Sequence, residues 1–88
     1  MGQLTGKHIL VTGASSGMGR VFCQMIANEG ARVSLIARNE ERLRDTLSKM
    51  SGEGHKYYLC DLTNEDQIKS TIEQLEALDG VVFCAGIN

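Results

Sequence analysis

A glycine-rich segment from Thr12 to Gly19 constrains what this chain can fold into more than any other part of the sequence. It follows a short apolar run, residues 8–11, and precedes a stretch with helical periodicity. Glycine lets the backbone turn sharply and approach a ligand that a Cβ would block. A helix that begins there presents unpaired N–H groups and the positive end of its dipole to a phosphate. The segment therefore predicts a phosphate-binding turn between a strand and a helix.

Strand-like and helix-like patterns alternate along the rest of the chain. Strands are expected at residues 8–12, 32–37, 56–60 and 81–85. The first helix is expected to end at Gly30, and Asn39 to cap the second helix, with Thr63 or Asn64 capping the third. The apolar side chains of the first helix recur on one face, at Met18, Val21, Phe22, Met25 and Ile26.

This alternation predicts an α/β fold with a Rossmann-type parallel sheet, because strands joined by long helices form right-handed βαβ units. The expected strand order is 3-2-1-4, numbered along the chain, with helices on both faces of the sheet. Ligands bind such sheets at the carboxyl ends of the strands, near the switch between the first and fourth strands. One composite site is therefore expected at the residues that end these strands, namely Thr12, Ala37, Asp61 and Ala85.

The charge and apolar patterns argue against two classes of partner and against a metal site. Nine basic residues are scattered among 88 and the formal net charge is −2, so we expect no nucleic acid partner. The longest apolar run, residues 81–85, is too short to span a membrane. His8 and His55 are isolated from metal-ligating neighbours. We interpret the three cysteines as core residues in a reducing cytoplasm, without zinc-site spacing, at Cys23, Cys60 and Cys84.

The glycine-rich turn supplies the candidates for binding a pyrophosphate. A Walker phosphate loop is excluded, because no lysine followed by serine or threonine comes after the last glycine. The serine hydroxyls would donate to a phosphate, cap the helix, or do both. An ordinary glycine-rich turn is the alternative. The candidate residues are Gly13, Ser15, Ser16, Met18 and Gly19.

The end of the second expected strand indicates which dinucleotide fits. NAD sites commonly place a carboxylate there to bind the ribose hydroxyls, whereas this chain has Ala37 and Arg38. A small neutral residue leaves room for a 2′-phosphate, and a guanidinium binds it through two parallel hydrogen bonds. The alternative is a solvated Arg38 that pairs with Glu40 or Glu41. Arg38 therefore predicts NADP(H) as the cofactor.

Two further motifs follow the third and fourth expected strands. The pair Asp61-Leu62 suits an adenine edge, because a carboxylate accepts from an exocyclic amine. The alternative is an aspartate that only shapes the turn before the third helix. Small residues after the fourth strand would let a ribose and pyrophosphate pass close to the backbone, and these are Cys84, Ala85 and Gly86.

With these motifs in this order, the chain resembles the short-chain dehydrogenase/reductase family over nearly its whole length. Residues 10–19 are similar to the glycine signature of the family, and Ala37-Arg38-Asn39 is similar to its NADP-preferring members. Asp61-Leu62 is similar to its adenine-contacting pair, and Cys84-Ala85-Gly86 to its Asn-Ala-Gly motif, with a thiol in place of the amide. The resemblance implies hydride transfer between a nicotinamide and a carbonyl or alcohol substrate.

The catalytic residues that the resemblance implies are not found in this chain. The family uses a tyrosine, a lysine four residues later and a serine, but the residues four beyond Tyr57 and Tyr58 are Asp61 and Leu62. We therefore predict that residues 1–88 are a single, truncated dinucleotide-binding segment, inactive alone, of a protein that is a homo-oligomer when intact.

Two other interpretations stay open at this point. One is a self-standing, non-catalytic dinucleotide-binding or assembly module, which would have to cover its last strand by another chain. The run 81–85 is apolar on both faces, as in strands buried on both sides, and would otherwise form an exposed edge. The other is a segment of a methyltransferase or flavoprotein, which the lack of an acidic residue at position 37 or 38 disfavours.

Overall fold

The computed structural model describes residues 2–14 and 17–84, and within these residues one parallel sheet contains all four strands. The strands are β1 (His8–Thr12), β2 (Arg32–Ala37), β3 (Lys56–Leu59) and β4 (Gly80–Phe83). The connecting helices are α1 (Gly17–Asn28), α2 (Glu40–Ser48) and α3 (Glu65–Gln74). The strand order is β3-β2-β1-β4, so the predicted α/β Rossmann-type fold is confirmed.

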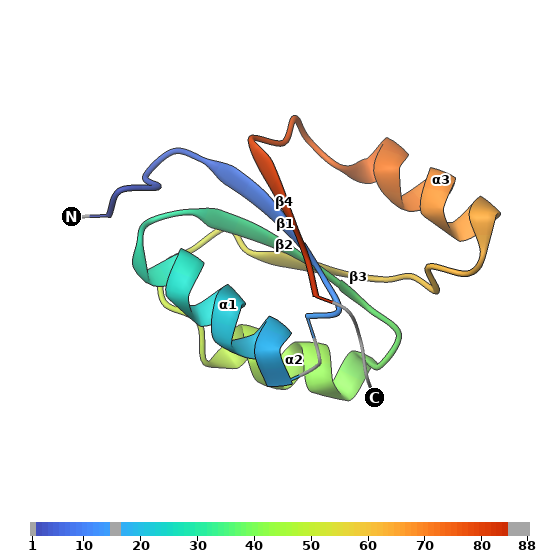
Figure 1. Ribbon diagram of the computed structural model, residues 1–88, viewed down its shortest axis with the longest axis horizontal. Helices are drawn as coiled ribbons and strands as arrows, with labels where there is room; N and C mark the ends of the chain where they lie inside the picture. Colours follow the sequence, from blue (N-terminus) through green and yellow to red (C-terminus); the bar gives the residue numbers. More distant parts are fainter. Residues whose placement is uncertain (1, 15–16, 85–88) are drawn as a thin grey trace.

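The helices cover the two faces of the sheet unequally. Figure 1 shows α1 and α2 side by side on one face, and α3 on the other. The larger part of the core lies under α1 and α2, where Val11, Leu35 and Leu43 are fully buried. A smaller cluster under α3 contains Leu10 and Ile36. None of the helices in the described part of the chain is long and apolar enough to span a membrane.

The helix α1 turns a face of small residues toward the sheet. Its buried residues are Gly19, Cys23 and Ala27. Much of the apolar stripe expected from the sequence faces solvent instead, with exposed fractions of 68% for Met18, 55% for Val21 and 56% for Met25. Small residues occupy the positions that face the sheet because they let the helix backbone pass close to the turn that follows β1.

The ends of the helices follow the capping signals of the sequence. Asn39 caps α2, with its Oδ1 accepting from the backbone N–H of Arg42 at 3.1 Å. Of the two candidates for α3, Asn64 is the cap and accepts from Gln67 at 3.1 Å. Gly30 follows α1 with a φ of +94°, which favours glycine. Two strand ends differ from those expected: β3 stops at Leu59, and β4 spans Gly80–Phe83.

The amino-terminal end of the sheet is held by a buried histidine. His8 is 4% exposed, and its Nδ1 donates to the carbonyl oxygen of Ala77 at 3.0 Å while its Nε2 shares a hydrogen bond of 2.6 Å with the Ser34 hydroxyl. The backbone N–H of His8 also donates to the Asp79 carboxylate at 2.8 Å. These contacts tie β1 to β2 and to the loop before β4, so His8 has a structural role.

Candidate functional site

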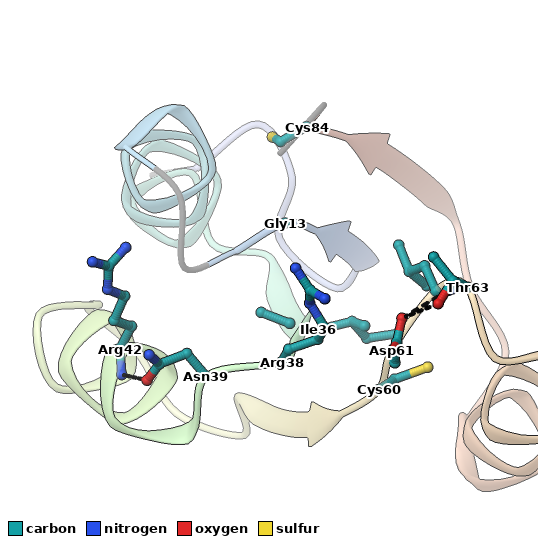
Figure 2. Close-up of a pocket in the computed structure, with 11 residues that line it drawn as sticks. Gly13, Ile36, Arg38, Asn39, Arg42, Cys60, Asp61, Thr63 and Cys84 are labelled. Carbon is teal, nitrogen blue, oxygen red and sulfur yellow. Dashed lines mark hydrogen bonds between the residues drawn. The ribbon is translucent and has the colours of Figure 1, made fainter. Parts of the chain in front are cut away.

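A cleft of about 670 Å³ opens at the carboxyl ends of the strands, where the strand order predicts a ligand site (Figure 2). It brings together six of the residues predicted from the sequence, namely Gly13, Ala37, Arg38, Asp61, Leu62 and Cys84. Its wall also contains residues that the sequence motifs do not indicate as ligands, among them Asn39, Arg42, Cys60 and Thr63. Ser15, Ser16, Ala85 and Gly86 lie outside the described residues.

Two glycines where β1 leads into α1 have no space for a side chain, one in the turn after β1 and one in the first turn of α1. Gly13 has a φ of +65°, and a Cβ there would lie 2.5 Å from the carbonyl oxygen of Cys84. A Cβ on Gly19 would overlap the carbonyl oxygen of Gly13. Met18, in contrast, does not line the cleft and belongs to a separate apolar hollow on α1. Gly13 therefore keeps the backbone of the turn bare where it borders the cleft, and Gly19 lets α1 approach that turn closely.

Arg38 stands at the end of β2 with its side chain exposed in the cleft. The alternative expected from the sequence, an ion pair with Glu40 or Glu41, is not formed among the described residues. Glu40 instead accepts from Arg44 at 3.4 Å and from the Tyr57 hydroxyl at 2.9 Å, on the side of α2 that faces β3. The guanidinium of Arg38 is therefore available to an anion in the cleft.

Asp61 lies across the cleft from the glycine turn, in a loop that its own carboxylate organises. Its Oδ1 accepts from the backbone N–H of Thr63 at 2.9 Å and from the Thr63 hydroxyl at 2.7 Å. These hydrogen bonds, with a smaller effect of the Arg38 charge, hold the pKa of Asp61 below its usual range. The turn-forming role considered above is thus present. It is compatible with ligand binding, because Oδ2 has no hydrogen bond within the described residues.

Cys23 and Cys84 are neighbours in the core cluster that also contains Ala14, the residue after Gly13. The backbone N–H of Cys84 donates to the carbonyl oxygen of Thr12 at 3.3 Å, which continues the pairing of β4 with β1. Burial, and then the neighbouring Cys84, raise the pKa of the Cys23 thiol to about 12. Burial also raises the pKa of Cys84. Both thiols are therefore neutral near pH 7, and no group of three or more metal-ligating side chains occurs in the described ranges.

The accessibility of the three thiols gives a test of this packing. Cys23 and Cys60 are 0% and 2% exposed, whereas Cys84 is half-buried beside the cleft. We expect a maleimide to modify Cys84 first in the native chain, and all three cysteines in urea. Mass spectrometry of peptides after timed labelling measures the order. Modification of Cys23 before Cys84 would contradict the position of α1 against the sheet.

Comparisons with known proteins agree with this geometry. A family profile described as short chain dehydrogenase matches residues 7–88. A short chain dehydrogenase of Pseudocercospora fijiensis is 41% identical over 92 aligned positions, and the alignment covers 98% of this chain and 30% of that protein. A solved short chain dehydrogenase/reductase family protein has a TM-score of 0.88 at 32% identity, covering 97% of this chain and 36% of the other.

A further solved structure bears on the cofactor. NAD⁺-bound xylitol dehydrogenase has a TM-score of 0.77 at 30% identity, and the match covers 81% of this chain and 28% of that protein. Against these proteins the chain thus spans about a third of the length or less.

Proposed function

This chain belongs to the short-chain dehydrogenase/reductase family, and from that premise we propose that it is the NADP(H)-binding segment of an oxidoreductase acting on a carbonyl or alcohol. Members of this family bind nicotinamide dinucleotides. The observation that carries the choice of NADP(H) is Arg38, which enters the cleft without an ion pair among the described residues.

The residues present fit such a cofactor. The bare backbone at Gly13 and Gly19 would accommodate the pyrophosphate where a Cβ would collide with protein atoms. Arg38 would bind the 2′-phosphate, and Asp61, beside Leu62, would accept from the adenine amine. Ser15, Ser16, Met18, Cys84, Ala85 and Gly86 complete the proposed set. When bound, the nicotinamide supplies or accepts the hydride, and the residues of this segment hold and orient the cofactor.

This segment is proposed to bind cofactor without supplying the proton donor. The Tyr57 hydroxyl donates to Glu40 and accepts from Arg44 Nε at 3.2 Å, on the side of α2 that faces β3. Tyr58 packs against the smaller core cluster on the α3 side. Neither tyrosine lines the cleft. We therefore expect cofactor binding by this chain in the absence of turnover.

The preference for NADP(H) is a property of this chain's own residues. The similar xylitol dehydrogenase is described as NAD⁺-bound, so similarity alone does not favour one dinucleotide. A hydrogen bond to a charged group contributes about 1.5–3 kcal/mol, which corresponds to roughly ten- to a hundredfold in affinity. The position after β2 holds Arg38 where a carboxylate would repel the 2′-phosphate.

The proposal is tested by titrating the purified chain with NADPH and NADH, and repeating both titrations on Arg38→Ala. We expect the wild-type chain to bind NADPH about ten- to a hundredfold more tightly, and the variant to lose this difference while its NADH affinity stays unchanged. Nicotinamide fluorescence or calorimetry measures the constants. Arg44→Ala is the control, because Arg44 pairs with Glu40 away from the cleft. Equal binding of both cofactors to the wild-type chain would refute the proposal.

A further inference from the structure

We propose that Thr46 is a positioning residue for cofactor binding, because its hydroxyl holds the turn between β1 and α1 from the side of α2. This inference rests on the proposed NADP(H)-binding function and deepens it. Thr46 stands outside the sequence motifs described above, and it is fully buried. It therefore acts through the turn and does not itself touch a ligand.

Both polar groups of the Ala14 backbone are bound by the part of the chain that forms β2 and α2. The N–H donates to the carbonyl oxygen of Ile36 at 3.2 Å, and the carbonyl oxygen accepts from Thr46 Oγ1 at 3.3 Å. Ile36 lines the cleft, two residues before Arg38. Ala14 directly follows Gly13, whose backbone borders the same cleft. The turn is thus fixed at two points, one on a strand and one on a helix.

The carbonyl group of Ala14 needs this hydroxyl because water does not reach it. Ala14 and Thr46 are each 0% exposed. Thr46 Oγ1 also lies 2.9 Å from the carbonyl oxygen of Arg42, one helical turn earlier. A threonine inside a helix commonly bonds to that carbonyl, which in a helix also accepts from the N–H of the fourth residue after it. The Ala14 carbonyl lies in a turn, without the regular ladder of a helix or strand, so loss of the hydroxyl should affect it more.

The turn has little room to move except toward the cleft. A Cβ on Gly13 would lie 2.5 Å from the carbonyl oxygen of Cys84, at the end of β4, and one on Gly19 would overlap the carbonyl oxygen of Gly13. The backbone of the turn is therefore packed closely by α1 and β4 as well as by β2 and α2. Without the Thr46 hydroxyl, a shift that gives Ala14 a new donor would bring the turn into the space proposed for the pyrophosphate.

This arrangement predicts different effects on the two phosphate groups of the cofactor. The pyrophosphate occurs in both NADPH and NADH and is proposed to bind at the turn, whereas the 2′-phosphate is assigned to Arg38. Loss of the Thr46 hydroxyl should therefore weaken both dinucleotides and leave the ratio of their affinities unchanged. Adenosine 2′-monophosphate, which has the 2′-phosphate and no pyrophosphate, should be insensitive to it.

The test measures the binding of NADPH, NADH and adenosine 2′-monophosphate to the wild-type chain and to Thr46→Val, which has nearly the same shape without the hydroxyl. We expect the variant to bind both dinucleotides about three- to tenfold more weakly and to bind adenosine 2′-monophosphate within about twofold of wild type. Thr46→Ser, which keeps the hydroxyl, should restore most of the dinucleotide affinity. Circular dichroism and urea denaturation of each variant establish that it is folded during the titrations.

Thr71→Val is the matched control. Thr71 is 5% exposed and is the buried residue of α3, on the opposite face of the sheet (Figure 1). The same chemical change there should leave all three affinities unchanged. If Thr46→Val does not fold, Thr46→Ser and Thr46→Ala give the comparison, because these two variants differ by the hydroxyl alone. The serine variant should then bind NADPH more tightly than the alanine variant, and equal affinities would overturn the inference.

The other outcomes separate this inference from the function on which it rests. If the wild-type chain prefers NADPH and Thr46→Val binds it equally well, the role of Thr46 is wrong and the proposed function stands. If Thr46→Val weakens adenosine 2′-monophosphate as much as NADPH, or if Thr71→Val weakens the dinucleotides to the same extent, Thr46 supports the fold in general and the inference is also wrong. If the wild-type chain binds neither dinucleotide, the proposed function fails and the inference fails with it.

Discussion

Replacing Gly19 by alanine is expected to destabilise the chain by about 2–3 kcal/mol and to weaken NADPH binding at least about tenfold. The added Cβ would overlap the carbonyl oxygen of Gly13, and it would lie 2.9 Å from the carbonyl carbon of Gly13 and 3.0 Å from the Cα of Ala14. These are backbone atoms, which cannot move aside as the end of a flexible side chain can. The helix α1 must therefore retreat from the turn, or the turn must enter the space proposed for the pyrophosphate.

Gly17→Ala is the matched control for this substitution. Gly17 is the first residue of α1, and a Cβ there meets nothing within 4 Å. Alanine is a better helix former than glycine, by up to about 1 kcal/mol within a helix, so this variant should be as stable as the wild-type chain or slightly more stable. Urea denaturation and NADPH titration of both variants give the comparison. Equal effects of the two substitutions would contradict the close approach of α1 to the turn.

Leu43→Ala is expected to cost about 2–5 kcal/mol of stability, enough to unfold much of a domain this small. Leu43 is fully buried between α2 and the sheet, in the cluster that contains Val11 and Leu35. Truncation removes the apolar contacts and leaves a cavity that neighbouring strands cannot fill without losing their register. Because α2 also carries Thr46, which contacts the turn proposed to hold the pyrophosphate, the same substitution should weaken NADPH binding.

Leu59→Ala makes the same chemical change at an exposed site. Leu59 is 50% exposed at the end of β3, the strand at one edge of the sheet. Its loss should reduce the free energy of unfolding by less than about 1 kcal/mol. Urea denaturation followed by circular dichroism measures both variants. A smaller loss for Leu43→Ala than for Leu59→Ala would mean that α2 does not pack on the sheet as described.

The sequence predicted the arrangement of strands and helices because its signals are local and repeated. Caps such as Asn39 and the stop at Gly30 act within a turn of the helix they limit, and the strand order follows from the crossover rule. The buried face of α1 was harder to predict. Large apolar residues dominate a periodicity count, whereas the sheet contacts the smaller Cys23 and Ala27. Which face is buried depends on how closely two backbones approach, and that is a tertiary property.

The residues of the candidate site could be predicted from the sequence where they lie next to strand ends. Residues next to strand ends, such as Gly13, Arg38 and Asp61, meet in the cleft because the topology brings those ends together. Arg42 stands four residues after Arg38, and this spacing was a signal available in the sequence. Its side of α2 is decided by the packing of Leu43 and Thr46, the buried residues of that helix, so its place at the cleft required the structure.

The contacts of His8 also bear on the order in which this chain folds during synthesis. Its hydrogen bonds to Ala77 and Asp79 join residues 69 and 71 positions apart, and β1 pairs with β4 across a similar separation. Closing such long loops has an entropic cost, and non-local pairing slows folding. A ribosome releases β1, α1 and β2 well before β4. One edge of β1 therefore stays open in the nascent chain until β4 emerges, and Cys84 joins the cleft after Gly13 and Arg38 are already in place.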